Sequence, residues 1–205
     1  MKTILVTAFE PFGGSGRNSS LDTLRVLPEE IGGARIVKRE MPVEYVHSGE
    51  ALVRAAEEIG DLAAVLCLGQ AEGRGNITPE FLAVNVRHAS IADNAGTLCR
   101  YARIDGDGPG ARFVTLPVER MVSRLAERGI PAAPSFSAGT YVCNSILYAA
   151  LAWGEAHGVP AGFVHLPLSE EIAEAEGKTG RVPALAQSVL TAGIEEILGV
   201  IAEGL

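Results

Sequence analysis

Cys143 is the residue of this chain whose setting most favours chemistry. It follows Ser137-Ala138-Gly139-Thr140 and opens a stretch of helical period that continues to His157. A thiol in the first turn of a helix lies near unpaired backbone N–H groups and the positive end of the helix dipole, and both should lower its pKa. The alternative is a buried small hydrophobe, the usual fate of a free cysteine. The context of Cys143 favours a nucleophile.

A nucleophilic thiol needs a base, and His165 is the best candidate. It closes an apolar, strand-like run, from which it could reach a thiol on a neighbouring element. A carboxylate could hold its other ring nitrogen, and Glu80, at the end of a polar loop, is suited to that role. Asp93 is the main rival of Glu80, and His88 is a weaker competitor of His165. These residue types predict catalysis by a cysteine, a histidine and a carboxylate.

The other two cysteines have simpler explanations. Cys67 lies within the apolar run LAAVLCLG and is expected to be buried, and Cys99 lies in an irregular stretch. Three cysteines are an odd number, and there is no CxxC pair and no histidine at metal-ligand spacing. The pattern favours a reducing, cytoplasmic compartment and no metal centre.

Apolar runs of strand length alternate with segments of helical period, which indicates an α/β sheet in a single domain over residues 1–205. Strands are expected at 3–8, 35–43, 62–68, 81–86, 131–137 and 163–166, and helices at 18–28, 44–59, 117–128, 143–157 and 183–203. Residues 90–110 show no period and predict a long loop. Ligands of such sheets bind at the carboxyl ends of strands, where segments 9–18, 69–80, 90–110, 138–143 and 165–168 fall.

Composition excludes several other classes of protein. The chain is 47% hydrophobic with a net charge of −8, so disorder is excluded and no basic surface for nucleic acid is evident. No apolar run approaches the length of a membrane span, and the first apolar stretch is too short for a signal peptide. The Gly-rich segment 13–19 lacks the Gly-Lys-Ser/Thr ending of a P-loop. The flanking Phe9 and Phe12 could enclose a flat, apolar ligand.

Several spaced motifs together resemble the pyroglutamyl-peptidase I (pyrrolidone-carboxylate peptidase) family of cysteine peptidases. They are ILVTAFEPFGGSGRN, CLGQAEGRGNITPEFLAVN, DNAG, SAGTYVCNSILY and GFVHLPL, and they cover almost the whole chain. The resemblance implies an enzyme that removes N-terminal pyroglutamate (5-oxoproline) from peptides through a thioester. It implies Cys143 as the nucleophile, His165 as the general base and Glu80 as the residue that orients His165.

The resemblance also implies a pocket, a fold and an assembly. Phe9 and Phe12 would enclose the five-membered ring, with Gln70, Ile91 and Val142 shaping the rest. The implied fold is an α/β/α sandwich around a central, twisted, mostly parallel (mixed) sheet. The implied enzyme needs no metal or other cofactor, is cytosolic, and forms a homo-oligomer, often a tetramer.

One position departs from the family pattern. Members typically carry Arg-Ile-Pro-Asp-Asn where this chain has Ser90-Ile91-Ala92-Asp93-Asn94, so an arginine near the oxyanion is replaced by Ser90. Arg74 or Arg87 could compensate in part, or the loop could be rearranged. Two alternatives follow: another thiol amidase or acyl hydrolase of similar fold, or a pyroglutamate-binding protein of low activity.

Overall fold

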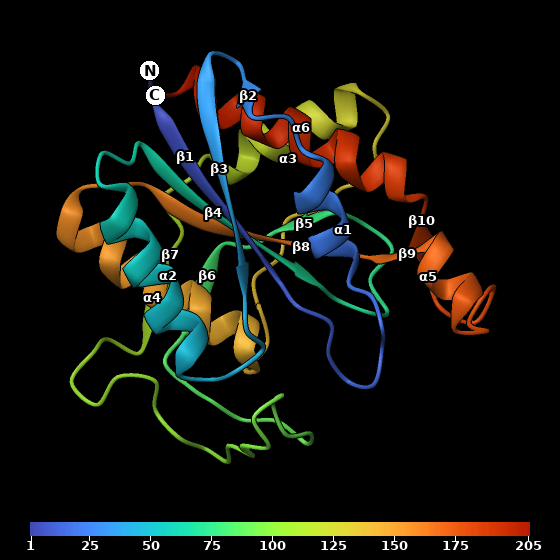
Figure 1. The fold of residues 1–205 in the computed structure, drawn as a ribbon, viewed down its shortest axis with the longest axis horizontal. Coiled ribbons are helices and arrows are strands. Elements are labelled where there is room, and N and C mark those ends of the chain that lie inside the picture. The colour runs from blue at the N-terminus through green and yellow to red at the C-terminus, as the bar shows by residue number, and fades with distance from the viewer.

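The computed structural model describes residues 1–205 and is built on a six-stranded sheet with the order β2-β3-β1-β4-β8-β5 (Figure 1). Its four central strands are mutually parallel: β3 (Ala34–Met41), β1 (Thr3–Phe9), β4 (Ala64–Gln70) and β8 (Ala161–Leu166). The short edge strands β2 (Glu30–Ile31) and β5 (Thr78–Pro79) run antiparallel to their neighbours. The prediction of a mixed, mostly parallel α/β sheet is confirmed.

Helices cover both faces of the sheet, which gives the expected α/β/α arrangement (Figure 1). One face holds α1 (Ser19–Val26), α3 (Val118–Glu127) and α6 (Gln187–Glu203), and the other holds α2 (His47–Ile59) and α4 (Val142–His157). Adjacent strand residues point to opposite faces, so Val6 and Leu66 pack in the first core while Leu5 and Val65 pack in the second. Burial on both faces explains the near-continuous apolar runs of β1 and β4.

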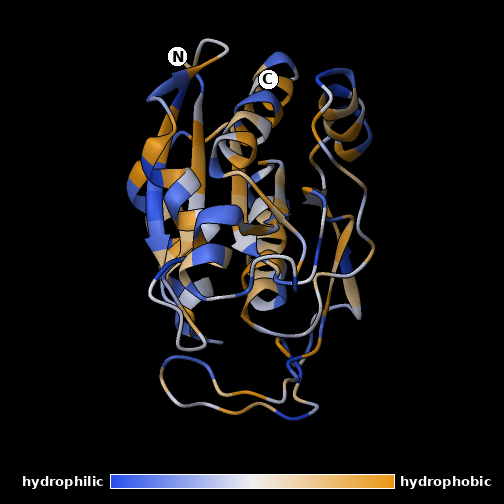
Figure 2. Cartoon of the chain, turned by 90° about the vertical axis from the view of Figure 1, so that its right-hand side faces the viewer, coloured by the Kyte–Doolittle hydropathy of each residue, from blue (hydrophilic) through white to orange (hydrophobic).

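The remaining elements are short. They are the antiparallel pair β6 (Leu82–Val84) and β7 (Ala111–Phe113), the parallel pair β9 (Leu168–Ser169) and β10 (Ala184–Leu185), and helix α5 (Glu170–Ala175). The segment 86–110 contains no named helix or strand and projects from the body in both views (Figures 1 and 2). This agrees with the irregular loop expected at 90–110.

Three sequence predictions need correction. Residues 131–137 form no strand but only isolated bridges from Ala132 and Ser135, because Pro131 and Pro134 cannot donate to a ladder. The strand expected at 81–86 is limited to β6. The last helix begins at Gln187 rather than at residue 183, since the intervening residues pair with β9.

No helix of the chain combines the length and the apolar character that a membrane crossing requires.

Candidate active site

The nucleophile candidate lies where two central strands end. Cys143 is the second residue of α4, as expected of a thiol in a first helical turn. A Cβ placed on Gly69 would lie only 3.0 Å from Cys143 Sγ. Gly69 pairs in register with His165 on the adjacent strand, and register partners on parallel strands present their side chains on the same face. The Cys143 thiol and the His165 ring therefore lie on one face of the sheet.

Glu80 meets His165 from the edge of the sheet. Its Oε1 lies 2.7 Å from His165 Nδ1, and the Glu80 side chain is fully buried. Strand β5 brings it there because Thr78 pairs with His165 in antiparallel register, and the Thr78 hydroxyl donates to the His165 carbonyl at 3.3 Å. The structure thus brings together the three residues that the sequence singled out.

The rival residues are occupied elsewhere. The Asp93 carboxylate accepts backbone N–H groups of residues 45, 95 and 97, which organises the turn that follows Ile91. The His88 ring stacks on Tyr101 with centroids 4.2 Å apart. Cys67 is fully buried in the middle of β4, as predicted. Neither Asp93 nor His88 contacts the Glu80–His165 pair.

The electrostatics of the site correct one prediction. Cys143 is only partly exposed, and the residues packed around it raise the pKa of its thiol to about 12; the nearby Glu80 carboxylate adds to the rise, while Arg74 and the backbone oppose it. Burial also lowers the pKa of His165, an effect that its bond to Glu80 only partly reverses. For Glu80, burial alone would raise the pKa, but His165, Ser135 and Arg74 together lower it. At neutral pH the resting site holds a neutral thiol, a neutral imidazole and an ionised Glu80, so the expected low thiol pKa is wrong.

The N-terminus of α4 offers hydrogen-bond donors beside the thiol. No side chain caps this helix end, so the backbone N–H groups of its first turn, including that of Cys143, are available to an anion. The turn is held by Asn144, whose amide accepts from the Val84 N–H at 2.9 Å and donates to the carbonyls of Val84 and Val86 at 2.8 and 3.0 Å. Sequence reasoning did not single out Asn144, and its only signal is its place beside Cys143.

The five predicted pocket residues have different surroundings. Phe9 and Val142 are buried in the core on the α2–α4 face, whereas half of the Ile91 surface is exposed. Phe12 and Gln70 line a cavity of about 300 Å³, together with residues 13–16, Glu72, Glu176 and Lys178. Four larger cavities, of about 460 to 590 Å³, contain none of the predicted site residues.

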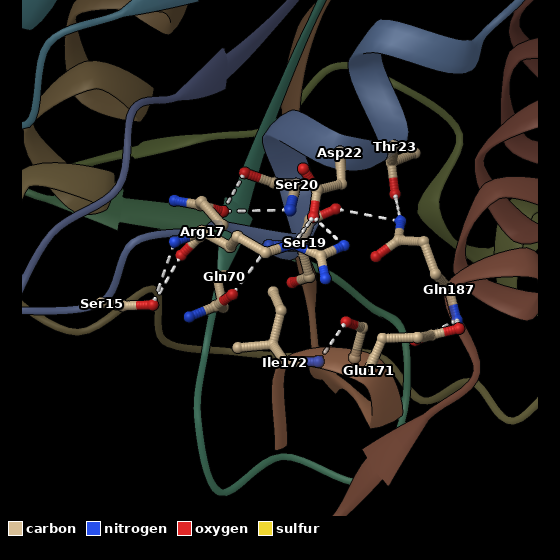
Figure 3. Close-up of polar contacts among 12 residues, drawn as sticks. Ser15, Arg17, Ser19, Ser20, Asp22, Thr23, Gln70, Glu171, Ile172 and Gln187 are labelled. Carbon is tan, nitrogen blue, oxygen red and sulfur yellow. Dashed lines mark hydrogen bonds and ion pairs between the residues drawn. The ribbon is translucent and has the colours of Figure 1, made fainter. Parts of the chain in front are cut away.

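The orientation of Gln70 follows from its contact with α1. Its Oε1 accepts the backbone N–H of Ser19 at 2.8 Å (Figure 3), and Ser19 in turn donates from its hydroxyl to the Pro167 carbonyl. The helix begins there because the Asn18 side chain accepts from the Ser20 N–H. With its oxygen engaged in this way, the Gln70 amide turns its nitrogen away from Ser19 (Figure 3).

The two arginines proposed to compensate for Ser90 are differently placed. Arg74 donates from Nη1 to Glu80 Oε1 at 2.7 Å and from Nη2 to the Ser137 carbonyl at 3.0 Å. Arg87 lines one of the larger cavities, beside Tyr45. Ser90 is exposed. Compensation therefore remains a prediction, and Arg74 already has partners. No cluster of three or more His, Cys, Asp or Glu residues could hold a metal ion.

Comparison with known proteins gives consistent matches over the whole chain. The family model for pyroglutamyl peptidase matches residues 2–203. A pyrrolidone-carboxylate peptidase of Thermococcus kodakarensis is 40% identical over 98% of this chain and 97% of that protein, and one of Streptococcus suis is 39% identical over 98% and 92%. The crystal structure of pyroglutamyl peptidase I from Bacillus amyloliquefaciens superposes with a TM-score of 0.93 at 32% identity, covering 99% of this chain and 98% of that one.

Proposed function

The chain belongs to the pyroglutamyl peptidase family, and on that premise we propose that it removes N-terminal pyroglutamate from peptides with Cys143 as nucleophile, His165 as general base and Glu80 as the residue that orients His165. One observation supports these roles most directly. The Cys143 thiol lies on the same face of the sheet as His165, and the buried Glu80 bonds His165 at Nδ1.

The resting protonation states suit a concerted first step. With Nδ1–H donating to Glu80, His165 Nε2 is the atom free to accept a proton. It takes the thiol proton as Cys143 Sγ attacks the carbonyl carbon of the scissile amide, and Glu80 stabilises the imidazolium that forms. The backbone N–H of Cys143 donates to the oxyanion.

His165 next protonates the departing amine, the C–N bond breaks, and a pyroglutamyl thioester of Cys143 remains. Water then attacks the thioester while His165 removes its proton. The second tetrahedral intermediate collapses, releases pyroglutamate and returns the proton to the thiol.

The pocket side chains suit an uncharged lactam ring. Phe9 and Phe12 supply apolar surface, and the Gln70 amide nitrogen, turned away from Ser19, is a donor for the lactam carbonyl. Proline has no such carbonyl, so it would leave a donor of the site unpaired. Because unpaired polar groups are costly in a closed site, prolyl substrates are rejected.

We extend the proposal to the setting of the enzyme, as the family resemblance implies: a homotetramer in the cytoplasm. The large exposed aromatic side chains of Phe113 and Phe136 support association between copies, and the three unpaired cysteines support a reducing compartment. Light scattering after size-exclusion chromatography tests the tetramer.

Release of a chromophore from a pyroglutamyl amide, beside prolyl and alanyl amides, tests the activity. We expect turnover of the pyroglutamyl amide alone, abolished by Cys143→Ala and largely spared by Cys67→Ala and Cys99→Ala. Pyroglutamate binding without turnover would instead indicate a binding protein, and turnover of the alanyl amide alone would indicate another thiol amidase. Full activity of the Cys143 variant would overturn the mechanism.

A further inference from the structure

Arg74 and His165 both contact the same oxygen atom of Glu80. Its Nη1 lies 2.7 Å from Glu80 Oε1, the same oxygen that lies 2.7 Å from His165 Nδ1. The other arm of its guanidinium donates to the Ser137 carbonyl at 3.0 Å, on the segment that leads into α4. A single side chain thus joins the carboxylate behind the base to the segment before the nucleophile.

We propose that Arg74 is a positioning residue, which holds the Glu80 carboxylate against His165 and fixes it relative to the segment that precedes Cys143. This inference rests on the proposed function, since it assigns Arg74 a part in the same reaction. Arg74 is not a catalytic residue in this scheme, because its contacts are with Glu80, Thr78 and Ser137 and not with the thiol.

The burial of Glu80 requires such a partner. Its side chain has no exposed surface, and an isolated buried carboxylate is strongly unfavourable. The charged or titratable groups around it are Arg74 from the segment after β4, His165 on β8 and Cys143 on α4. With Cys143 and His165 neutral at rest, Arg74 is the only permanent positive charge in contact with the carboxylate.

The shape of the guanidinium matters as well as its charge. Its planar fork bonds acceptors in different directions at once: Glu80 Oε1 and the Thr78 hydroxyl from Nη1, and the Ser137 carbonyl from Nη2. A lysine at this position supplies the charge on a single, flexible ammonium. Arg74→Lys therefore keeps the charge but loses the contact with the Ser137 carbonyl, and Arg74→Gln removes the charge altogether.

The test compares both variants with the wild type and with Arg128→Gln. The control removes an ion pair of similar geometry, Arg128 Nε to Glu196 at 2.8 Å, far from the site. For Arg74→Gln we expect kcat to fall by about 10- to 100-fold, the loss that one charge-assisted hydrogen bond represents, with little change in KM. Arg74→Lys should recover part of kcat, and Arg128→Gln should behave as wild type.

The pH profile distinguishes positioning from a general structural effect. Loss of the Arg74 charge makes protonation of both Glu80 and His165 easier, so the acid limb of kcat/KM moves to higher pH in Arg74→Gln and less in Arg74→Lys. An active wild type beside an Arg74→Gln variant with unchanged kcat and acid limb overturns the inference. If Arg74→Gln does not fold, the Arg74→Lys variant serves as the test. A kcat and an acid limb equal to those of the wild type in Arg74→Lys then count against the inference.

A second readout separates this inference from the proposed function. An inactive wild type counts against the function, and the inference then depends on alkylation of Cys143 by iodoacetamide, located by mass spectrometry. We expect slower alkylation at neutral pH in Arg74→Gln and an unchanged rate in Arg128→Gln. Equal rates in all three proteins overturn the positioning role.

Discussion

Replacement of Gly69 by alanine tests how tightly the site is packed. A Cβ at this position would lie 2.7 Å from Phe163 Cζ, closer than such carbons approach other heavy atoms, and 3.0 Å from Cys143 Sγ, which is tighter than an ordinary contact. Gly69 belongs to a buried central strand, paired in register with His165, so the backbone has little freedom to retreat. The added methyl group must therefore displace Phe163, the thiol, or both.

The size of the effect follows from those distances. Ordinary contact begins near 3.4 Å, so the ring and the thiol must each move by several tenths of an ångström. The Phe163 ring is confined by the His165 ring, with centroids 4.7 Å apart, so the strain reaches the base as well. Overpacking of this kind costs about 1–3 kcal/mol of stability. Because misplacement of reacting groups by about 1 Å can cost 10²-fold in rate, we expect kcat to fall by about 10- to 100-fold.

Gly162→Ala is the matched control. It adds a methyl group on the neighbouring strand, 2.9 Å from Leu116 Cδ1 and from Val114 Cγ1, where it faces the other core. Thermal unfolding should show that both variants lose stability, while steady-state kinetics with a pyroglutamyl amide should show that only Gly69→Ala loses kcat. Equal kcat in Gly69→Ala and the wild type would refute the reasoning, and so would an equal loss in both variants.

Three further predictions follow from the site and its surroundings. Since burial lowers the pKa of His165 and the base must be neutral, the acid limb of kcat/KM should lie below the ordinary histidine value of 6.5; a limb at or above that value contradicts the assignment. Burial raises the pKa of Cys67 from 9.0 to about 12, so the folded thiol keeps its proton while the unfolded one loses it. The free energy of unfolding should therefore fall by about 1.4 kcal/mol per pH unit between pH 9.0 and about 12. Denaturant titrations at several pH values should show a smaller fall in Cys67→Ala than in the wild type. Asn144→Ala should lower the free energy of unfolding by about 2 kcal/mol or more, measured by thermal unfolding, because it leaves buried backbone groups unpaired, and it should also lower kcat. Unchanged stability and kcat would show that Asn144 does not hold the turn.

The parts of the fold that could be predicted are those with a strong period. Strands such as β1 and β4 are buried on both faces and reveal themselves as apolar runs, and α4 shows a helical period. Two-residue strands such as β5 are too short for any period. They form because longer neighbours offer hydrogen-bonding partners, which is tertiary information. β5 is nevertheless the strand that delivers Glu80 to His165.

The candidate site shows the same division. Residue type and position at strand ends were enough to single out Cys143, His165 and Glu80. The partners that hold them, such as Asn144 and the fork of Arg74, depend on segments meeting in space and carry no local pattern. Gly69 is similar, since the need for a glycine there comes from the thiol of another element.

The sequence predicts a low thiol pKa because only one of two opposing effects is visible in a sequence. A helix N-terminus stabilises a thiolate by about 0.3–1 kcal/mol, which is less than one pKa unit. Desolvation opposes it, by up to about 3–5 units where a group is fully buried, and its extent is set by the packing of α4 against the sheet. For Cys143 burial is the larger effect, and it raises the pKa of the thiol to about 12.

The neutral resting state of Cys143 and His165 affects how Glu80 contributes to catalysis. A thiolate and an imidazolium already present at rest would be stabilised by Glu80 before any substrate bound, and only interactions that strengthen on the way to the transition state accelerate the reaction. With Cys143 and His165 both neutral, His165 becomes positively charged only as the thiol attacks. The Glu80 carboxylate, 2.7 Å from Nδ1, then stabilises that charge. The stabilisation by Glu80 is thus reserved for the transition state. Substitution of Glu80, or of Arg74, which holds it, should therefore lower kcat and leave KM nearly unchanged.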